Sequence, residues 1–165
     1  MILAIDVYYI ENTAKSVGVL FEWEDEQARE VIIDTLEGVS DYEPGAFFKR
    51  ELPCITSLLQ KIPLEKIDLI VVDGYVYVDD ALKYGLGGYV WEYLDPKIPV
   101  IGVAKNSFHA NKNTVFPLYR GESKKPLYIS AIGMDVMDAV SCIQKMKGNY
   151  RFPTILKSLD TMTKE

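Results

Sequence analysis

The most constraining feature of this chain lies in residues 67–74, where apolar side chains follow one another almost without interruption up to Asp73. A continuous apolar run, unlike an alternating one, is typical of a strand that is buried on both faces of a sheet. Such a strand needs a neighbouring strand on each side and a covering layer on each face. The run therefore predicts the central strand of an α/β domain and places Asp73 at its carboxyl end.

The other apolar segments supply the remaining layers of such a domain. Residues 2–9 and 16–23 are separated by a short turn-prone segment and predict a hairpin, to which residues 28–36 add a third antiparallel strand. Further strands are predicted at residues 99–104 and 126–130, and helices at residues 47–59, 79–94, 136–148 and from 154 onward. Pro53 is expected to mark a kink or a new first turn. This order predicts a mixed sheet flanked by helices in a single domain spanning residues 1–165.

Length and composition are those of an ordinary globular domain. The 165 residues are 48% hydrophobic and 25% charged, which suffices for one core without stabilising metals or disulfides. Cys54 and Cys142 lie far apart without a CxxC spacing, so they indicate buried thiols in a reducing compartment. No apolar run approaches the roughly 18–20 residues that cross a bilayer. We therefore expect a cytoplasmic protein without a membrane partner.

Two acidic residues interrupt or end apolar strands, where an unpaired carboxylate is costly. Asp6 lies within the first run, and Asp73 ends the central strand, at the edge where open α/β sheets collect ligand groups. If these strands are neighbours, the two carboxylates can hold a hard divalent ion such as Mg²⁺ or Mn²⁺, with Glu51 and Asp135 as candidates to complete the site. Each acid also has a structural explanation, as a carboxylate satisfied by a backbone amide or an arginine, as half of an Asp-Gly turn, or as a solvated surface group.

The chain offers little for other chemistries. Its one histidine, His109, lies in a polar stretch that is typical of a surface loop. No GxSxG, Walker or dinucleotide-binding glycine pattern is present, since Gly85, Gly87 and Gly88 follow no predicted strand directly and precede no Lys-Ser or Lys-Thr pair. The net charge of −6 argues mildly against nucleic acid as a partner, unless basic side chains cluster locally or divalent ions cancel a nest of acids.

Several short blocks along the chain are informative in combination. They are Ala-Ile-Asp-Val at residues 4–7, Tyr-Glu-Pro-Gly at 42–45, Phe-Lys-Arg-Glu-Leu-Pro at 48–53, Val-Val-Asp-Gly at 71–74, Pro-Val-Ile-Gly-Val-Ala-Lys at 99–105, Lys-Pro-Leu-Tyr-Ile-Ser at 125–130 and Gly-Asn-Tyr-Arg-Phe-Pro at 148–153. In this order they resemble the endonuclease V family, nucleases of the ribonuclease H-like fold that act on strands containing deaminated adenine. The resemblance extends over nearly the whole chain.

The resemblance implies a ribonuclease H-like fold with a catalytic centre formed by Asp6, Glu51 and Asp73, which would hold Mg²⁺ or Mn²⁺. It also implies that Lys105 lies near the scissile phosphate. The implied reaction is hydrolysis of a phosphodiester near inosine, in DNA or RNA, by a metal-activated water without a covalent protein intermediate. Nucleic acid is the partner that follows from this resemblance.

The segment that contains Tyr42, Pro44 and Gly45 corresponds, by the same resemblance, to the wedge loop of the family. That loop inserts at the lesion and helps to separate the target base from its neighbours. In this chain the segment carries Asp41 and Glu43, where the family commonly has proline and isoleucine. An acidic wedge would repel phosphate, which puts inosine specificity in question.

The chain also departs from the family pattern beside the acids. Tyr75 and Val76 follow the Asp-Gly pair where the family usually has His-Gly, and Gly133, Met134 and Asp135 stand where it has Gly-His-Arg. Asp135 could supply an oxygen ligand in place of the lost histidine. Two hypotheses follow: a Mg²⁺- or Mn²⁺-dependent endonuclease, and a catalytically altered ribonuclease H-like domain that binds nucleic acid or protein. A small-molecule hydrolase that uses the same acids has no motif in its favour.

Overall fold

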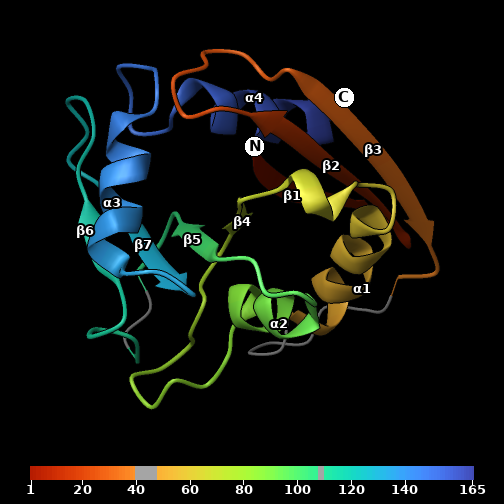
Figure 1. Cartoon of the computed structure of the whole chain (residues 1–165), viewed down its shortest axis with the longest axis horizontal. Helices are drawn as coiled ribbons and strands as arrows, with labels where there is room; N and C mark the ends of the chain where they lie inside the picture. Colours follow the sequence, from red (N-terminus) through yellow and green to blue (C-terminus); the bar gives the residue numbers. More distant parts are fainter. Residues whose placement is uncertain (40–47, 108–109) are drawn as a thin grey trace.

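The computed structural model describes residues 1–39, 48–107 and 110–165. In these ranges seven strands form one sheet, which four α-helices and a short 3₁₀ turn accompany (Figure 1). The strands are β1 (Ile2–Ile10), β2 (Thr13–Phe21), β3 (Glu30–Glu37), β4 (Leu69–Asp73), β5 (Val100–Ala104), β6 (Phe116–Leu118) and β7 (Leu127–Ile132). The helices are α1 (Phe48–Leu59), α2 (Leu86–Tyr93), α3 (Val136–Lys145) and α4 (Thr154–Thr163), with the 3₁₀ turn η1 at Leu64–Lys66. None of the helices in the described ranges is long and apolar enough to span a membrane.

The sheet has a parallel centre and antiparallel margins. Its strand order is β3-β2-β1-β4-β5-β7-β6, so β4 occupies the central position that its continuous apolar sequence predicts. Strands β1, β4 and β5 are parallel to one another, and the remaining strand pairs are antiparallel. The predicted hairpin and third strand form the β1-β2-β3 meander, with Glu11 in a left-handed conformation (φ 55°) in the tight turn. All three parallel strands therefore end at the same edge of the sheet.

Strand alternation divides the core into two layers. Ala4 of β1 belongs to the layer that contains residues of α3 and α4, such as Ile143 and Ile155. Leu3, the preceding residue, belongs to the layer that contains residues of α1 and α2, such as Ile55. Because the parallel strands are covered on both faces, polar side chains reach solvent at the strand ends.

The expected helix at residues 47–59 is confirmed by α1, and of the two alternatives for Pro53 the new first turn is wrong, since the burial of the later turns outweighs one lost hydrogen bond. Two further elements differ from the sequence-based expectation. α2 begins at Leu86 and not at residue 79, because the Asp79 carboxylate accepts a hydrogen bond from the Ala81 backbone N–H and stabilises a turn. β6 has no counterpart among the predicted strands, since three residues that include Pro117 form no recognisable pattern.

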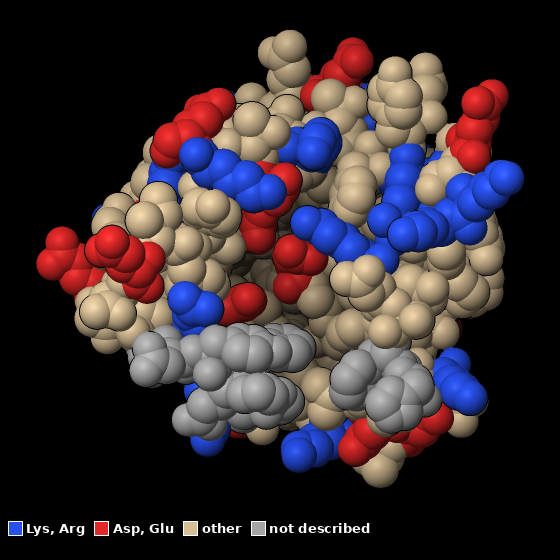
Figure 2. Space-filling model, turned by 180° about the vertical axis from the view of Figure 1, so that it is seen from behind, with Lys and Arg blue, Asp and Glu red and all other residues tan. Residues whose placement is uncertain are grey.

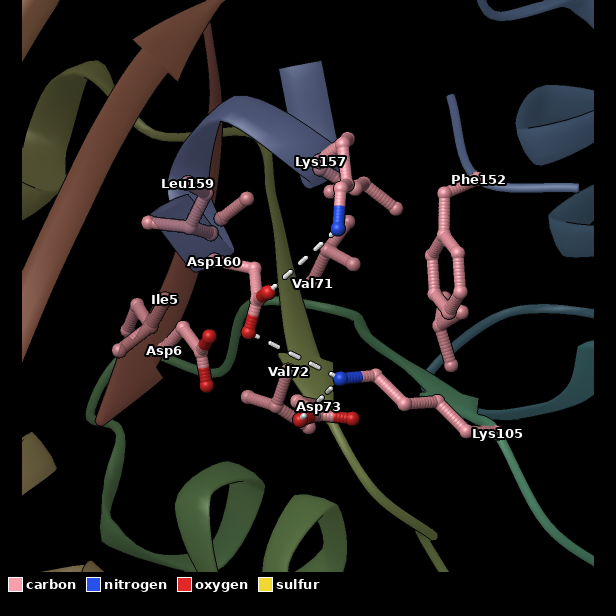
Figure 3. Close-up of a pocket in the computed structure, with 13 residues that line it drawn as sticks. Ile5, Asp6, Val71, Val72, Asp73, Lys105, Phe152, Lys157, Leu159 and Asp160 are labelled. Atoms are coloured by element: carbon pink, nitrogen blue, oxygen red, sulfur yellow. Dashed lines mark ion pairs between the residues drawn. The ribbon is translucent and has the colours of Figure 1, made fainter. Parts of the chain in front are cut away.

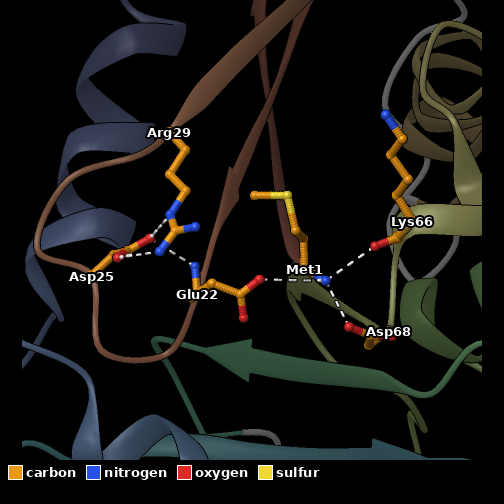
Figure 4. Close-up of polar contacts among 6 residues, drawn as sticks. All are labelled: Met1, Glu22, Asp25, Arg29, Lys66 and Asp68. Carbon is orange, nitrogen blue, oxygen red and sulfur yellow. Dashed lines mark hydrogen bonds and ion pairs between the residues drawn. The ribbon is translucent and has the colours of Figure 1, made fainter.

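The amino end of β1 is fixed to the start of β4 by polar contacts (Figure 4). The Met1 amino group donates hydrogen bonds to the Lys66 carbonyl oxygen at 3.0 Å and to the Asp68 carboxylate at 2.6 Å.

An ion pair of 2.7 Å between Arg29 and Asp25 closes the loop from β2 to β3. Exposed ion pairs of this kind contribute little to stability individually. Their consequence is positional, because the Met1 contacts help to set the register of β1 against β4.

An ion pair between a buried carboxylate and a half-exposed lysine joins β3 to the end of α1. Asp34 of β3 is only 6% exposed, and its Oδ1 lies 2.7 Å from the ammonium group of Lys61, which follows α1. Burial raises the pKa of Asp34, but the Lys61 and Ser57 side chains outweigh burial and hold this pKa below its ordinary value. The contact anchors the helix that carries Glu51 to the outer strands of the sheet.

We expect Asp34→Ala to lower the free energy of unfolding by about 1–2 kcal/mol at pH 7, since the half-exposed Lys61 is left unpaired in the folded state. The depressed pKa of Asp34 means that this contribution is present above the unfolded-state pKa of about 3.9 and is lost as the pH falls below it. Urea unfolding at pH 7 and pH 3 measures the difference. Glu30→Ala, at an exposed position of the same strand, is the control. Equal midpoints for Asp34→Ala and the wild type at pH 7 would contradict the assignment.

Candidate active site

Strand register places Asp6 beside Asp73. Ile5 of β1 pairs with Val72 of the parallel strand β4. The next residues of the two strands, Asp6 and Asp73, therefore lie next to each other at the point where pairing ends. The two strands that carry the predicted acids are thus neighbours in the sheet.

Strand alternation turns three charged side chains toward the same face. Each charged residue follows, by two positions, a core residue of the layer covered by α3 and α4. The three charged residues are Asp6, Asp73 and Lys105, and the core residues that precede them are Ala4, Val71 and Val103. The carboxyl ends of β1, β4 and β5 therefore present two acids and one base to the side on which α4 packs.

These side chains line a pocket between the sheet edge and α4 (Figure 3). Lys105 Nζ lies 3.9 Å from Asp73 Oδ2 and 3.8 Å from Asp160 Oδ1, so that one ammonium group bridges two acids. Asp160 of α4 also lies 3.1 Å from Lys164 Nζ and 3.9 Å from Lys157 Nζ. Burial raises the pKa of Asp160, but these lysines outweigh burial and keep it below its ordinary value. Asp160 therefore carries a negative charge at neutral pH.

Glu51 approaches the same acids from the opposite face of the sheet. It lies in the first turn of α1 and interacts electrostatically with Asp73 and Asp6. The neighbouring Arg50 stacks on the ring of Tyr9, with its guanidinium carbon 3.7 Å from the ring centroid. This contact holds the first turn of α1 against the β1-β2 hairpin and so places Glu51 at the strand ends.

Burial raises the pKa values of the three acids predicted from the sequence, and neighbouring acids add to the shift. The pKa of Asp6 is raised to about 7, first by burial and then by Asp73. The pKa of Glu51 is raised to about 8 by burial, then by Asp73 and Asp6. The pKa of Asp73 is also raised by burial, although 44% of its side chain is exposed and Lys105 opposes the shift. The site concentrates more negative charge than it can hold without a counter-ion.

Two arginines hold the backbone that carries Lys105. Arg151 donates hydrogen bonds to the carbonyl oxygen of Lys105 and, at 2.7 Å, to that of Pro126. Arg120, which is 5% exposed, donates to four carbonyl oxygens of the segment between α3 and α4 that contains Arg151. The ring of Phe152 lies 5.4 Å from Lys105 Nζ and 5.4 Å from the guanidinium carbon of Arg151. Lys105 is therefore held by its backbone and by a cation–π contact.

Other residues named from the sequence have different positions. Asp135 is exposed and caps α3, where its Oδ1 accepts the Met137 backbone N–H at 2.7 Å. Asp135 is absent from the residues that line the described pocket, and its role as a metal ligand stays a prediction. Tyr75, at the position of the family histidine, donates its hydroxyl to the Asn106 carbonyl oxygen, and burial raises its pKa to about 12. Four further residues lie outside the described ranges: Tyr42, Pro44, Gly45 and His109.

Asp160 is the residue of the site that sequence reasoning missed. Lys157 and Lys164 stand three residues before and four residues after it, a spacing that predicts a solvated charge pair on a helix surface. The available signal was the buried residue Leu159 directly before Asp160, which indicates that the acid lies at the margin of the packed face of α4. That signal is shared by many surface acids and does not identify a site.

The donor chemistry of the pocket fits a hard divalent ion, since its acids offer carboxylate oxygens. Within the described ranges, however, no three Asp, Glu, His or Cys side chains are arranged so that they could hold one ion. Lys105 bridges Asp73 and Asp160 instead. A divalent ion could bind here if it displaced this ammonium group and the carboxylates turned toward it. Figure 2 shows acidic side chains around a hollow on this side of the molecule, with basic side chains on either side of it.

The parallel centre with antiparallel margins, flanked by helices, defines a ribonuclease H-like fold, here with acids at the carboxyl edge of the sheet. The model of the Endonuclease V family matches residues 1–161. The chain therefore belongs to the endonuclease V family, as the ordered sequence blocks indicate.

Solved structures of the same family are similar to the chain over 99% of its length. Human endonuclease V is 20% identical, with a TM-score of 0.79 and 82% of that chain covered. Bacillus subtilis endonuclease V is 16% identical, with a TM-score of 0.80 and 78% of that chain covered. Ciona intestinalis endonuclease V, solved in complex with a 24mer DNA containing an inosine followed by a ribo-adenosine, is 16% identical, with a TM-score of 0.82 and 84% of that chain covered. No curated protein matches the sequence.

The raised pKa of Asp6 predicts that this residue destabilises the ion-free protein. An acid whose folded pKa lies near 7 instead of about 3.9 costs stability that grows as the pH rises from about 4 to about 7. We expect Asp6→Asn to raise the Tm at pH 8, without divalent ions, by about 3–8 °C and to change it little at pH 4. The asparagine keeps the oxygen that accepts the Val7 backbone N–H. Thermal unfolding followed by circular dichroism measures both values.

The matched control for this experiment is Asp135→Asn, because Asp135 is exposed and asparagine caps a helix equally well. Its Tm should stay close to that of the wild type at both pH values. A lower Tm for Asp6→Asn at pH 8 would refute the electrostatic account of the site.

Proposed function

We propose that the protein is a metal-dependent endonuclease that hydrolyses phosphodiester bonds near inosine in DNA or RNA. The observation that carries this proposal is the gathering of Asp6, Glu51 and Asp73 from three elements at the carboxyl edge of the parallel strands. The raised pKa values of Asp6 and Glu51 indicate a charge excess that a divalent cation would neutralise. Membership of the endonuclease V family supports the same activity.

In this proposal the acids and Lys105 have different chemical roles. Asp6, Glu51 and Asp73 would hold Mg²⁺ or Mn²⁺, with Asp160 or Asp135 as a further ligand. The bound ion would supply an activated water and stabilise charge on the attacking and leaving oxygens.

Lys105 has the complementary task. Once released from Asp73 and Asp160, its ammonium group donates hydrogen bonds to a non-bridging oxygen of the scissile phosphate. Arg151 keeps the Lys105 backbone in place during this exchange. Hydrolysis proceeds without a covalent bond to the protein, and the leaving oxygen departs with a proton from water.

The proposed substrate rests on the family and on charge. The Ciona intestinalis protein was solved with inosine-containing DNA, which supports inosine as the feature recognised here. We further propose that Tyr42, Pro44 and Gly45 form the wedge that separates the target base, and that the role of the protein is repair of deaminated nucleic acid. Basic side chains beside the acidic hollow in Figure 2 supply the local positive charge that a chain of net charge −6 needs to bind phosphate.

The proposal extends to the cellular setting. Cys54 and Cys142 are both free, which supports a reducing compartment, and we place the protein in the cytoplasm. All described strands join a single sheet, which supports one functional domain over residues 1–165.

One observation favours a second function, that of a nucleic-acid-binding domain with altered catalysis. Tyr75 takes the place of the family histidine and uses its hydroxyl to tie two loops together. Its pKa of about 12 leaves it neutral, so it offers neither the nitrogen nor the charge of an imidazole near the acids.

Cleavage of defined oligonucleotides tests the endonuclease proposal. With Mn²⁺, the wild type is expected to cut an inosine-containing strand, and Asp73→Asn to lose activity. Lys105→Gln should lower kcat by about 100-fold or more, the usual effect of losing one charge-stabilising donor. Lys124→Gln, an exposed lysine outside the pocket, is the control and should cut at the wild-type rate.

The outcomes separate the two functions. A wild type that binds inosine-containing strands but cuts none, while an active family member cuts them under the same conditions, would identify the binding domain. If the wild type cuts strands with and without inosine equally well, the nuclease activity is supported and the inosine specificity is refuted.

Calorimetric titration with Mn²⁺ tests the ligand set independently of activity. Binding to the wild type and its loss in Asp73→Asn are expected. Asp160→Asn should weaken binding by about tenfold, or 1.4 kcal/mol, if Asp160 is the additional ligand. Asp135→Asn should then bind as the wild type does. The reverse pattern would assign the additional ligand to Asp135, and unchanged binding in Asp73→Asn would exclude this metal site.

A further inference from the structure

A surface beside the acid pocket has no part in the function described so far. β1 pairs with β4 over residues 2–5 but with β2 along its whole length, so the β1-β2 hairpin extends past the carboxyl end of β4. Asp6, Tyr8 and Ile10 alternate along this extension onto the face on which α4 packs. Tyr8 is 37% exposed and Ile10 is 64% exposed. Apolar side chains thus become more exposed with distance from the acids.

Two lysines accompany Tyr8 on this face. Lys164 Nζ lies 6.0 Å from the centroid of the Tyr8 ring, and the same ammonium group lies 3.1 Å from Asp160. Lys15 stands directly opposite Tyr8 on β2 and donates hydrogen bonds to the carbonyl oxygens of Met162 and Glu165. These bonds fix the end of α4 against the hairpin. The ring is therefore carried by a rigid strand, next to a cation that also borders the acid pocket.

We propose that Tyr8, Ile10 and Lys164, here called the hairpin surface, bind the unpaired nucleotide strand that flanks the scissile phosphate. One base stacks on the Tyr8 ring, the phosphate beside it pairs with Lys164, and Ile10 contacts the next base. The substrate class in this inference rests on the proposed function. The assignment of these three side chains rests on their own geometry.

The chemistry of the hairpin surface fits a single strand. Exposed aromatic rings with neighbouring cations are the elements by which proteins bind unpaired nucleic acid, because every base offers a face for stacking. A base pair within a duplex keeps its faces covered by its neighbours, so a base that stacks on Tyr8 must lie in an unpaired segment.

The spacing along β1 gives the position of the stacked base. Asp6 and Tyr8 are two residues apart on a strand, or about 7 Å. Stacked nucleotides rise by about 3.4 Å each, so this distance corresponds to about two nucleotides. The base on Tyr8 therefore lies within about two nucleotides of the phosphate bound at the acids.

Binding of single-stranded oligonucleotides without divalent ions tests the proposal, since no cleavage then occurs. Fluorescence anisotropy gives the Kd, and 2-aminopurine, placed at one position at a time around inosine, reports stacking. Tyr8→Ala should raise the Kd by about 5- to 100-fold, the usual effect of losing one base–aromatic stack, while Tyr8→Phe stays within about twofold of the wild type. The 2-aminopurine signal should change at one or two adjacent positions in the wild type and not in Tyr8→Ala.

Matched variants complete the experiment. Tyr119→Ala removes a tyrosine that is 58% exposed and follows β6, at the far margin of the sheet, and it should bind as the wild type does. Lys164→Gln should reduce the slope of log Kd against log salt concentration by about one. Circular dichroism of each variant establishes that it is folded. A Kd for Tyr8→Ala within twofold of the wild type, or an equal loss in Tyr119→Ala, overturns the assignment.

The failure of this inference and that of the proposed function are distinguishable. If the wild type binds single strands through Tyr8 but cuts none with Mn²⁺, the role of the hairpin surface is supported and the nuclease function is refuted. A wild type that cuts, together with a Tyr8→Ala variant that binds and cuts equally well, retains the nuclease and refutes the hairpin surface. A wild type that binds no single strand without divalent ions and cuts none with Mn²⁺ refutes both.

Discussion

The repulsion between Asp6 and Asp73 is the interaction on which the rest of the site depends. The register of β1 against β4 pairs Ile5 with Val72, and the side chains of both strands pack alternately into the two core layers. The same register brings two carboxylates side by side at the strand ends. The packing of the core thus brings two like charges together in a partly buried position, where burial first and Asp73 second raise the pKa of Asp6 to about 7.

Cations held in place beside these acids offset part of their negative charge. Lys105 bridges Asp73 and Asp160, and Arg151 holds the Lys105 backbone. Arg120 holds in turn the segment that carries Arg151, by hydrogen bonds to several carbonyl oxygens. The positions of these groups follow from hydrogen bonds to backbone carbonyls, which resist displacement better than contacts between flexible side chains. The edge of the sheet that carries Lys105 is therefore held by hydrogen bonds to its backbone as well as by the packing of the core.

Much of this arrangement was accessible from the sequence, because the relevant signals are local. The continuous apolar run before Asp73 predicts the central strand, and the order of blocks predicts the family. Asp6 and Asp73 could be paired once their strands were taken as neighbours. Asp160 could not be assigned to the site from the sequence, since its flanking lysines at helical spacing give the pattern of a solvated helix surface. Its relation to Lys105 depends on how α4 crosses the sheet, which no local pattern specifies. The start of α2 was misplaced for a similar reason, because the turn at Asp79 competes with a helical apolar pattern.

The Lys105 ammonium group lies between Asp73 and Asp160, so it competes with any dissolved cation for these two carboxylates. A side chain tethered to the site acts like a ligand at a fixed effective concentration, which for short tethers lies in the millimolar range. A monovalent ion in solution would have to replace an ammonium group that carries the same charge and is already in place. A divalent ion carries twice the charge, so its stronger Coulomb attraction to the same two carboxylates would offset the free energy of displacing the ammonium group. If the proposed metal site exists, the tethered ammonium group would therefore favour a divalent ion over a monovalent one at Asp73 and Asp160.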